Sequence, residues 1–235
     1  MKKIGIIGAM EEEITPLLEL FPPRNRATLL GGNLFYHIVY KGAEIHIAYS
    51  KIGKVHSAIT ASTMILRFGC EKVIFCGVAG GLREDLAVGD LLLGTKLCQH
   101  DVDISAFGHP LGFIPESRVF IDTDDTLNAI ARQVALESNI TLKEGIIASG
   151  DAFIHSREKK QWIIDNFGAA AVEMEGASVA VVCDSFKVPF CILRSISDSA
   201  DGSADVSFDE FLDSSAKAGA DFVKKMVDKI VENDT

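Results

Sequence analysis

The sequence predicts an α/β protein, a three-layer α/β/α sandwich with a central mixed sheet. Apolar runs alternate with amphipathic runs along all 235 residues, as in folds where helices cover a sheet. Most apolar runs are almost continuous in Val, Ile, Leu and Phe, which is typical of strands covered on both faces. No Pro/Ser-rich linker, repeat or low-complexity tract interrupts the pattern, so we expect a single domain over residues 1–235.

Seven segments are predicted to be strands because each is a short apolar run. In chain order they are residues 3–9, 44–50, 72–80, 90–97, 144–150, 170–174 and 189–197. Helical spacing of apolar residues follows several of them. The apolar faces are Ile14, Leu17 and Leu18 for the first helix, and Leu127, Ile130, Val134 and Ala135 for a middle one. Residues 176–186 are expected to begin another helix. The clearest helix spans 207–232, where Ser207 and Glu210 form a predicted capping box.

Composition excludes several classes of function. A formal net charge of −10 argues against binding nucleic acid or an anionic membrane. No apolar stretch is long enough to span a membrane. The N-terminal apolar run is short, contains two glycines and ends in three glutamates, so we interpret it as a buried strand rather than a signal peptide. Five cysteines without C-x-x-C spacing indicate reduced, mostly buried thiols, a cytoplasmic location and no catalytic cysteine.

Carboxylates at the ends of three predicted strands are the main functional signal. They are Glu13 after the first strand, Glu173 and Glu175 around the sixth, and Asp198 after the last. Taken singly, each has an ordinary explanation, as a helix first turn, a cap or a turn former. Ligand groups gather where strands of an α/β sheet end, so their joint occurrence suggests one shared cleft.

Glu173 and Glu175 lie one residue apart in an otherwise almost wholly apolar run. On an extended segment both side chains project to one side and Met174 to the other. Burial of two carboxylates is costly unless they are paired or used in chemistry. Two adjacent acceptors suit the two hydroxyls of a vicinal diol.

Five motifs in this order resemble the 5′-methylthioadenosine/S-adenosylhomocysteine nucleosidase family. They are GIIGAMEEE (5–13), SGDAFI (149–154), VEMEGAS (172–178), RSISDSAD (194–201) and SFDEF (207–211). The stretch at 99–117, QHDVDISAFGHPLGFIPES, is similar to the branch that also hydrolyses 6-amino-6-deoxyfutalosine in a menaquinone route. The resemblance covers nearly the whole chain. It implies a nucleoside phosphorylase/nucleosidase-like fold and roles in methionine salvage and S-adenosylmethionine recycling.

The resemblance implies hydrolysis of the N-glycosidic bond between adenine and a 5′-substituted ribose, with no cofactor and no metal. Asp198 matches the general acid that protonates purine N7, and Ser197 would orient it. Glu13 matches the carboxylate that activates water. Glu175 matches the residue that binds the ribose hydroxyls and steadies the cationic transition state, with Glu173 in support. This division agrees with the chemistry, which needs one acid and one carboxylate to orient water.

The rest of the pocket is also implied by the resemblance. Phe153 would stack on adenine, the backbone of Ile154 would read the base edge, and Met174 would pack against the sugar. Pro115 and His109 match positions supplied by a second subunit, which implies a homodimer. Further residues expected to line the ribose, base or 5′ pocket are Met10, Ile52, Ala79, Gly80, Ile104, Phe107 and Phe208.

Three alternatives stand beside this interpretation. A phosphorylase of the same fold would need phosphate near the sugar, where Glu11–Glu13 should repel it, although Arg194 is a candidate anion contact. A metal site built on His100, Asp101, Asp103 and His109 has suitable ligands, but the spacing matches no strong zinc signature. A nucleoside-binding regulator would release no adenine. Gly5-x-x-Gly8 is not a dinucleotide fingerprint, so neither NAD nor FAD is expected.

Overall fold

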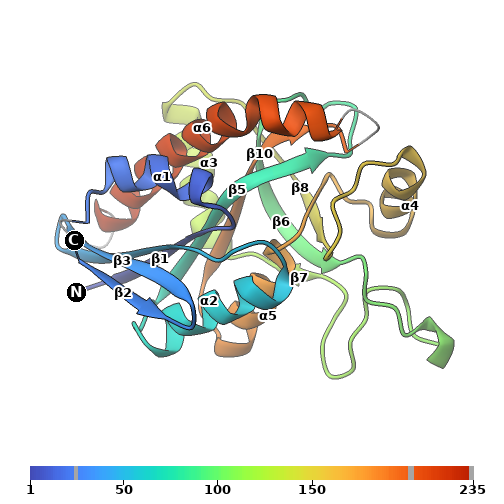
Figure 1. The fold of residues 1–235 in the computed structure, drawn as a ribbon, viewed down its shortest axis with the longest axis horizontal. Coiled ribbons are helices and arrows are strands. Elements are labelled where there is room, and N and C mark those ends of the chain that lie inside the picture. Colours follow the sequence, from blue (N-terminus) through green and yellow to red (C-terminus); the bar gives the residue numbers. More distant parts are fainter. Residues whose placement is uncertain (24–25, 201–203, 233–235) are drawn as a thin grey trace.

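The computed structural model describes residues 1–23, 26–200 and 204–232 (Figure 1). Its strands, in chain order, are β1 (Lys3–Gly8), β2 (Ala27–Leu30), β3 (Asn33–Tyr40), β4 (Ala43–Tyr49), β5 (Lys72–Gly81), β6 (Leu91–Gln99), β7 (Ile121–Asp122), β8 (Leu142–Ser149), β9 (Ala171–Glu173) and β10 (Phe190–Asp198). Its helices are α1 (Glu11–Leu20), α2 (Lys54–Leu66), α3 (Asp125–Glu137), α4 (Arg157–Phe167), α5 (Gly176–Phe186) and α6 (Ala204–Glu232), with a short 3₁₀ helix η1 (Ser105–Phe107).

All strands join one mixed sheet in the order β10-β6-β8-β9-β5-β1-β4-β3-β2, with β7 paired to β6. An additional pairing of β10 with β5 closes β10, β6, β8, β9 and β5 into a circuit. Within it, β5–β10, β6–β8 and β8–β9 are parallel, whereas β10–β6 and β5–β9 are antiparallel. The circuit brings the carboxyl ends of β5, β9 and β10 close together, and β1 places its own end beside β5.

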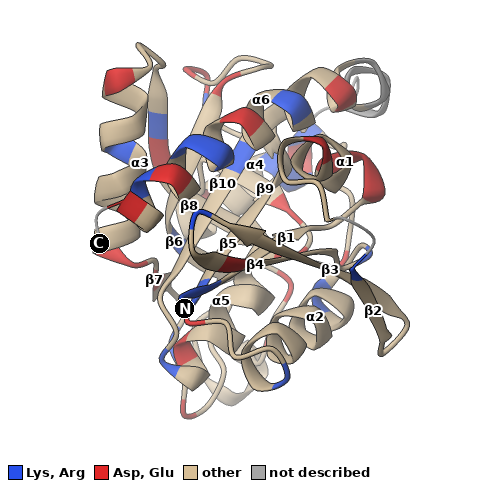
Figure 2. Ribbon diagram, turned by 90° about the vertical axis from the view of Figure 1, so that its left-hand side faces the viewer, with Lys and Arg blue, Asp and Glu red and all other residues tan. Residues whose placement is uncertain are grey.

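Helices cover both faces of the sheet, which confirms the predicted α/β fold with a central mixed sheet. Helices α1, α3 and α6 lie on one face, and α2 and α5 on the other (Figure 1). One apolar cluster fills the space under α1, α3 and α6, and a second lies between the sheet and α2 and α5. Charged residues lie mainly on the helices and loops, whereas the strands of the sheet are largely uncharged (Figure 2).

The seven predicted strands and the predicted helices are all present. Every residue of β10 is buried, and so is all of β5 except its first residue, as continuous apolar runs require. Ile14 and Leu17 of α1, and Leu127, Ile130, Val134 and Ala135 of α3, face the core as expected.

Two expectations about the elements need correction. The last helix begins by Ala204, so Ser207 lies inside it and the predicted capping box at its N-terminus is wrong. Asp201, the final residue of the RSISDSAD motif, lies outside the described residues. The β2–β3 hairpin was not predicted, although Gly31 and Gly32, both at positive φ, form its two-residue turn. In the described part of the chain, no helix is both long and apolar enough to cross a bilayer.

Candidate active site

A cavity opens at the carboxyl ends of β1, β5, β9 and β10. Its volume is about 480 Å³ including the space open to solvent, which is within the range of small-molecule sites. Glu13, Glu175 and Asp198 all line it, although 185 positions separate the first from the last. The remaining lining residues are Ala9, Met10, Ile52, Val78, Ala79, Gly80, Phe153, Val172, Glu173, Met174, Ser197 and Phe208.

Glu13 is held by three backbone N–H groups. Its Oε2 accepts from Ala9 and Met10, at 2.5 and 3.2 Å, and its Oε1 accepts from Val78 at 2.9 Å. The bond from Met10 caps the N-terminus of α1, so Glu13 has both the structural and the cavity-facing role considered from sequence. Glu13 is only 2% exposed to solvent. Burial raises the pKa of Glu13, and the nearby Arg194 and the N–H donors offset this only in part.

Glu175 lies between the end of β9 and the start of α5, where it is the N-cap residue. Its Oε1 accepts a hydrogen bond of 2.8 Å from the backbone N–H of Gly53, at the N-terminus of α2. Burial, followed by the neighbouring Glu173, raises the pKa of Glu175 to about 8. A carboxyl group with this pKa exchanges its proton near neutral pH, which is a common property of groups in active sites.

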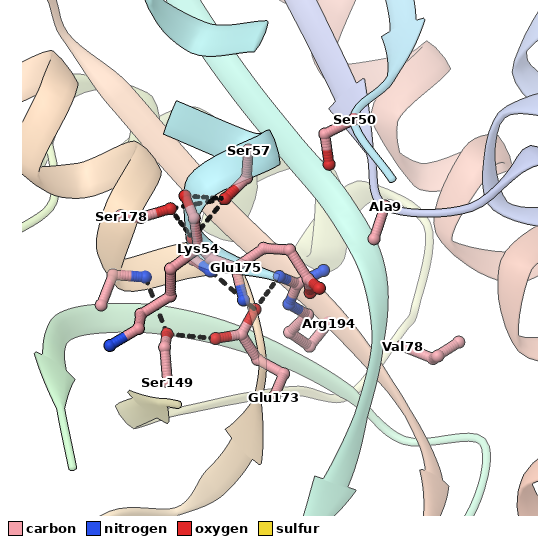
Figure 3. A network of polar contacts seen from close by, with 12 residues as sticks. Ala9, Ser50, Lys54, Ser57, Val78, Ser149, Glu173, Glu175, Ser178 and Arg194 are labelled. Carbon is pink, nitrogen blue, oxygen red and sulfur yellow. Dashed lines mark hydrogen bonds and ion pairs between the residues drawn. The ribbon is translucent and has the colours of Figure 1, made fainter. Parts of the chain in front are cut away.

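Glu173 has a different environment from Glu175. Its Oε2 accepts from the guanidinium of Arg194 and from the backbone N–H of Gly176 at 2.7 Å, and its Oε1 accepts from the Ser149 hydroxyl (Figure 3). Arg194 is fully buried below the cavity, with its Cζ 4.1 Å from the centre of the Phe75 ring. Glu173 therefore pairs with an internal cation and caps α5.

Arg194 does not line the cavity, so it is not placed as an anion contact there. Burial alone would lower its pKa, but Glu173, Glu13 and Glu175 raise it above its usual value. The guanidinium thus stays charged and reduces repulsion among the surrounding carboxylates.

The extended arrangement expected for 173–175 ends at Glu173, because β9 stops there. Met174 and Glu175 occupy a bend before α5. Both glutamates reach the cavity, as expected, but Met174 also lines it and does not point to the opposite side.

Asp198 ends β10 and faces the cavity. The pairing register of β10 and β5 shifts between Ile196 and Asp198, which sets Asp198 opposite Gly80. Its Oδ2 accepts from the Ser197 hydroxyl at 2.9 Å, and its Oδ1 accepts from the backbone N–H of Ala200 at 2.7 Å. A Cβ atom at Gly80 would lie 2.9 Å from Asp198 Oδ1, so the absence of a side chain there makes room for the carboxyl group.

Apolar and aromatic groups complete the cavity. The rings of Phe153 and Phe208 lie 5.9 Å apart at 80° and form an edge-to-face pair. Ile154 lines a small adjoining pocket together with Phe153 and Asp198. Met10, Ile52, Ala79, Gly80 and Ser197 line the main cavity, as the resemblance implied.

Four expected pocket residues lie away from the cavity of their own chain, in the segment 100–120. They are Ile104, Phe107, His109 and Pro115. The part of this segment that contains η1 extends from the body of the protein and lies far from the sheet (Figure 1). Phe107 is 82% exposed. The expectation that Ile104 and Phe107 line the pocket does not hold within one chain.

The four residues considered for a metal site have other surroundings. Asp101 accepts from Lys54 Nζ, and Asp103 accepts from the backbone N–H of Ser105. His109 stacks on Phe113, and His100 is buried against Gly150. Over residues 1–23, 26–200 and 204–232, no group of three or more His, Cys, Asp or Glu side chains is arranged to hold a metal ion.

Some cavity residues were not anticipated from sequence. Ala9, Val78 and Val172 adjoin predicted residues, so only their positions next to Met10, Ala79 and Glu173 could have indicated them. Ser149 and Gly53 hold the two glutamates from segments far away in the chain. Ser149 ends β8 and Gly53 precedes α2, and neither residue type indicates such a long-range contact in the sequence.

The fold and the cavity place the protein in a known class. The profile of the phosphorylase superfamily matches residues 3–232. An aminodeoxyfutalosine nucleosidase of Helicobacter pylori is 60% identical over 230 residues, covering 98% of this chain and 100% of that protein. A 5′-methylthioadenosine/S-adenosylhomocysteine nucleosidase of Staphylococcus carnosus is 39% identical over 225 residues, covering 95% of this chain and 98% of that protein.

Solved structures agree with the sequence relatives. An aspartate-to-asparagine mutant of the Helicobacter pylori enzyme, with 5′-methylthioadenosine in its active site, has 60% identity and a TM-score of 0.96. The match covers 97% of this chain and 99% of that one. The chain therefore belongs to the 5′-methylthioadenosine/S-adenosylhomocysteine nucleosidase family. It is a nucleosidase, a hydrolase of an N-glycosidic bond.

Proposed function

We propose that this nucleosidase releases adenine from 5′-methylthioadenosine, S-adenosylhomocysteine, 5′-deoxyadenosine and 6-amino-6-deoxyfutalosine. The observation that carries the proposal is the meeting of Glu13, Glu175 and Asp198 around one cavity with an aromatic pair at its side. Relatives named for three of these substrates support it. The apolar side chains of Met10, Ile52 and Phe208 line the same cavity and suit the apolar part of the 5′ substituent next to the ribose.

Cleavage of the bond places positive charge on the ribose and negative charge on the leaving purine. We assign Asp198 as the acid that protonates the purine, next to the Phe153 ring on which adenine stacks. Glu175 faces the ribose, where it accepts from the hydroxyls and stabilises the cationic sugar. Glu13 takes a proton from the attacking water, and its raised pKa makes it a stronger base than an exposed glutamate.

Hydrolysis, rather than transfer to phosphate, is supported by the bonds of Glu13. The backbone N–H groups of Ala9, Met10 and Val78 converge at the cavity and could have bound an anion. The carboxylate of Glu13 already accepts from all three. Phosphate at this point would have to displace a carboxylate and approach its charge, which costs free energy.

The test is adenine release from the four nucleosides in phosphate-free buffer, with the sugar product identified by mass spectrometry. Free sugar and unchanged rates on adding phosphate are expected. Formation of a ribose 1-phosphate would instead indicate a phosphorylase. Comparison of kcat/KM over the four nucleosides establishes the preferred substrate.

We further propose a homodimer in which segment 100–120 completes the 5′ pocket of the second copy. A phenylalanine exposed to 82% on an extended segment supports this proposal, because burial against a partner removes its apolar surface from water. Pro115, His109, Ile104 and Phe107 would then act across the interface. Sedimentation velocity tests the dimer, and Phe107→Ser should raise KM without changing the fold.

Two further points are proposals. The chain acts as one domain, supported by a family profile that spans residues 3–232 without a break. It works in a reducing compartment such as the cytoplasm, supported by five buried cysteines that form no disulfide.

A further inference from the structure

Three segments beside the cavity are joined by a closed ring of polar contacts. Lys54 is the first residue of α2, Asp101 follows β6, and Asp151 follows β8. Lys54 Nζ donates to Asp101 Oδ1 at 2.6 Å, the Asp151 N–H donates to Asp101 Oδ2 at 2.9 Å, and the Lys54 N–H donates to Asp151 Oδ1 at 2.8 Å. Each residue contacts both of the others, so loss of any one opens the ring.

The ring adjoins two parts of the proposed site. Gly53, the residue before Lys54, donates its N–H to Glu175. Phe153, two residues after Asp151, lines the cavity on the base side. Consecutive N–H groups at the N-terminus of α2 thus bind one carboxylate of the cavity and one carboxylate of the ring, where the positive end of the helix favours both.

The conformation of Gly53 makes this double contact possible. Its φ is +100°, a region that side chains disfavour, and an added Cβ would lie 3.1 Å from Asp151 Oδ1. A glycine here lets the helix N-terminus approach both carboxylates closely.

The Lys54–Asp101 pair is better shielded than an ordinary surface ion pair. The Lys54 side chain is 16% exposed, and its Nζ also donates to Gln99 Oε1 at 3.1 Å (Lys54 is labelled in Figure 3). Burial of Asp101 opposes ionisation, but Lys54 and the Asp151 N–H outweigh this and lower its pKa. Asp101 therefore stays ionised at neutral pH and keeps both contacts.

We propose that Lys54, Asp101 and Asp151 are positioning residues of the nucleosidase, which hold the ribose-facing Glu175 and the loop bearing Phe153 at a fixed separation. In the part of the chain that the structure describes, the cavity is lined by other residues and by none of these three. The inference rests on the roles proposed above for Glu175 and Phe153. A nucleoside spans both groups, so independent movement of α2 and the loop would misplace the sugar relative to the base.

The pH profile provides a readout that a purely structural role would not change. The Gly53 N–H bond lowers the pKa of Glu175, which Glu173, Arg194 and Glu13 also influence. Opening of the ring weakens that bond, so the pKa of Glu175 rises further. The acid limb of kcat/KM should then move to higher pH.

The experiment compares Lys54→Met, Asp101→Ala and their double variant, with adenine release as the assay. We expect each single variant to lose about tenfold in kcat/KM, with the acid limb of its pH profile displaced to higher pH. The double variant should lose no more kcat/KM than the more impaired of the two single variants. Lys54→Arg, which retains a cationic donor, should recover most of the activity. Lys229→Met, which removes an ion pair with Glu137 between α6 and α3, is the control and should behave like wild type.

Thermal unfolding establishes that each variant is folded, and Lys54→Gln replaces Lys54→Met if the latter does not fold. The proposal would be overturned if both single variants had near wild-type kcat/KM. It would also be overturned if the losses of the single variants multiplied in the double variant while the acid limb of the pH profile stayed at its wild-type position. Glu175→Gln separates this failure from one of the proposed function. If Glu175→Gln is inactive while the ring variants are normal, only the ring is refuted, whereas an active Glu175→Gln refutes the role of Glu175 itself.

Discussion

The floor of the cavity, which consists of Glu173 and of Arg194 below it, and its wall, which contains Glu13 and Glu175, both hold buried carboxylates. The hydrogen-bond and ion-pair partners of these carboxylates differ between the two regions. In the floor, Glu173 is paired with Arg194 and Ser149 and caps α5. In the wall, Glu13 is held by backbone N–H groups, and Glu175 by that of Gly53. The two layers touch at Gly77, where an added Cβ would meet Arg194 and lie 2.6 Å from Glu13 Oε1.

This difference suggests that the floor carboxylate serves mainly the stability of the fold, whereas the wall carboxylates serve the reaction. A carboxylate with an ion pair and several hydrogen-bond donors is held firmly in one position. A carboxylate held by neutral donors in a poorly solvated cavity has a raised pKa and can exchange a proton or meet a substrate cation. We therefore expect substitutions in the wall to affect turnover most and substitutions in the floor to affect folding most.

Asp198→Asn should have the largest effect on turnover. Asparagine keeps the shape but has no acidic proton for the leaving purine, so kcat should fall by about 10³–10⁴-fold. Adenine binding, measured by calorimetry, should stay near that of wild type. Rates within tenfold of wild type would show that another group is the acid.

Glu13→Gln should reduce kcat by about 10²–10³-fold, because glutamine cannot take the proton from water. Its single amide oxygen can replace only one of the two accepting carboxylate oxygens, so an N–H donor on the other side loses its acceptor and the unfolding temperature should also fall by a few degrees. Single-turnover rates of adenine release measure the effect. Normal rates would mean that another group positions the nucleophile.

Arg194→Met should lower stability by about 3–5 kcal/mol, because it leaves the Glu173 carboxylate buried without its cation. Urea unfolding gives the difference. Arg132→Met, which breaks the exposed pair with Glu144, is the matched control and should cost less than about 1 kcal/mol. Equal losses in the two variants would contradict the distinction between floor and surface.

Glu175→Gln should have a small effect on the fold, and that effect should be stabilising at pH 8. The folded-state pKa of about 8 exceeds the ordinary 4.5, so between these values the native state holds a proton that the unfolded chain has lost. Stability from this group is present below pH 4.5 and declines as pH rises towards 8. The variant should unfold a few degrees higher than wild type at pH 8, on the order of 1 kcal/mol, and no higher at pH 4.5. A lower unfolding temperature at pH 8 would contradict the assigned pKa.

Much of the fold could be predicted from continuous apolar runs such as 72–80 and 189–197, because a strand buried on both faces consists almost entirely of apolar residues. The β2–β3 hairpin was harder, since residues of β2 such as Leu29 are exposed and follow no buried pattern. The closure of the sheet through β5 and β10 involves partners more than 100 positions apart, for which one sequence contains no local signal.

The carboxylates of the site could be predicted from their residue type and from their positions at the ends of predicted strands. Glu13, Glu175 and Asp198 each follow an apolar run, so their convergence was a reasonable expectation. The partner of Glu173 could not be inferred, because an arginine inside the strand 189–197 indicates neither its burial nor its direction. The positions of Lys54, Asp101 and Asp151 depend on contacts between loops, which periodicity does not report.

The near-neutral titration of Glu175 also affects how ligand binding must be measured. A ligand that carries positive charge favours the ionised carboxylate, so its binding expels a proton into the solution. The heat recorded in a calorimeter then includes the protonation enthalpy of the buffer. Titrations of one cationic ligand in phosphate and in Tris should therefore give different apparent enthalpies but the same dissociation constant.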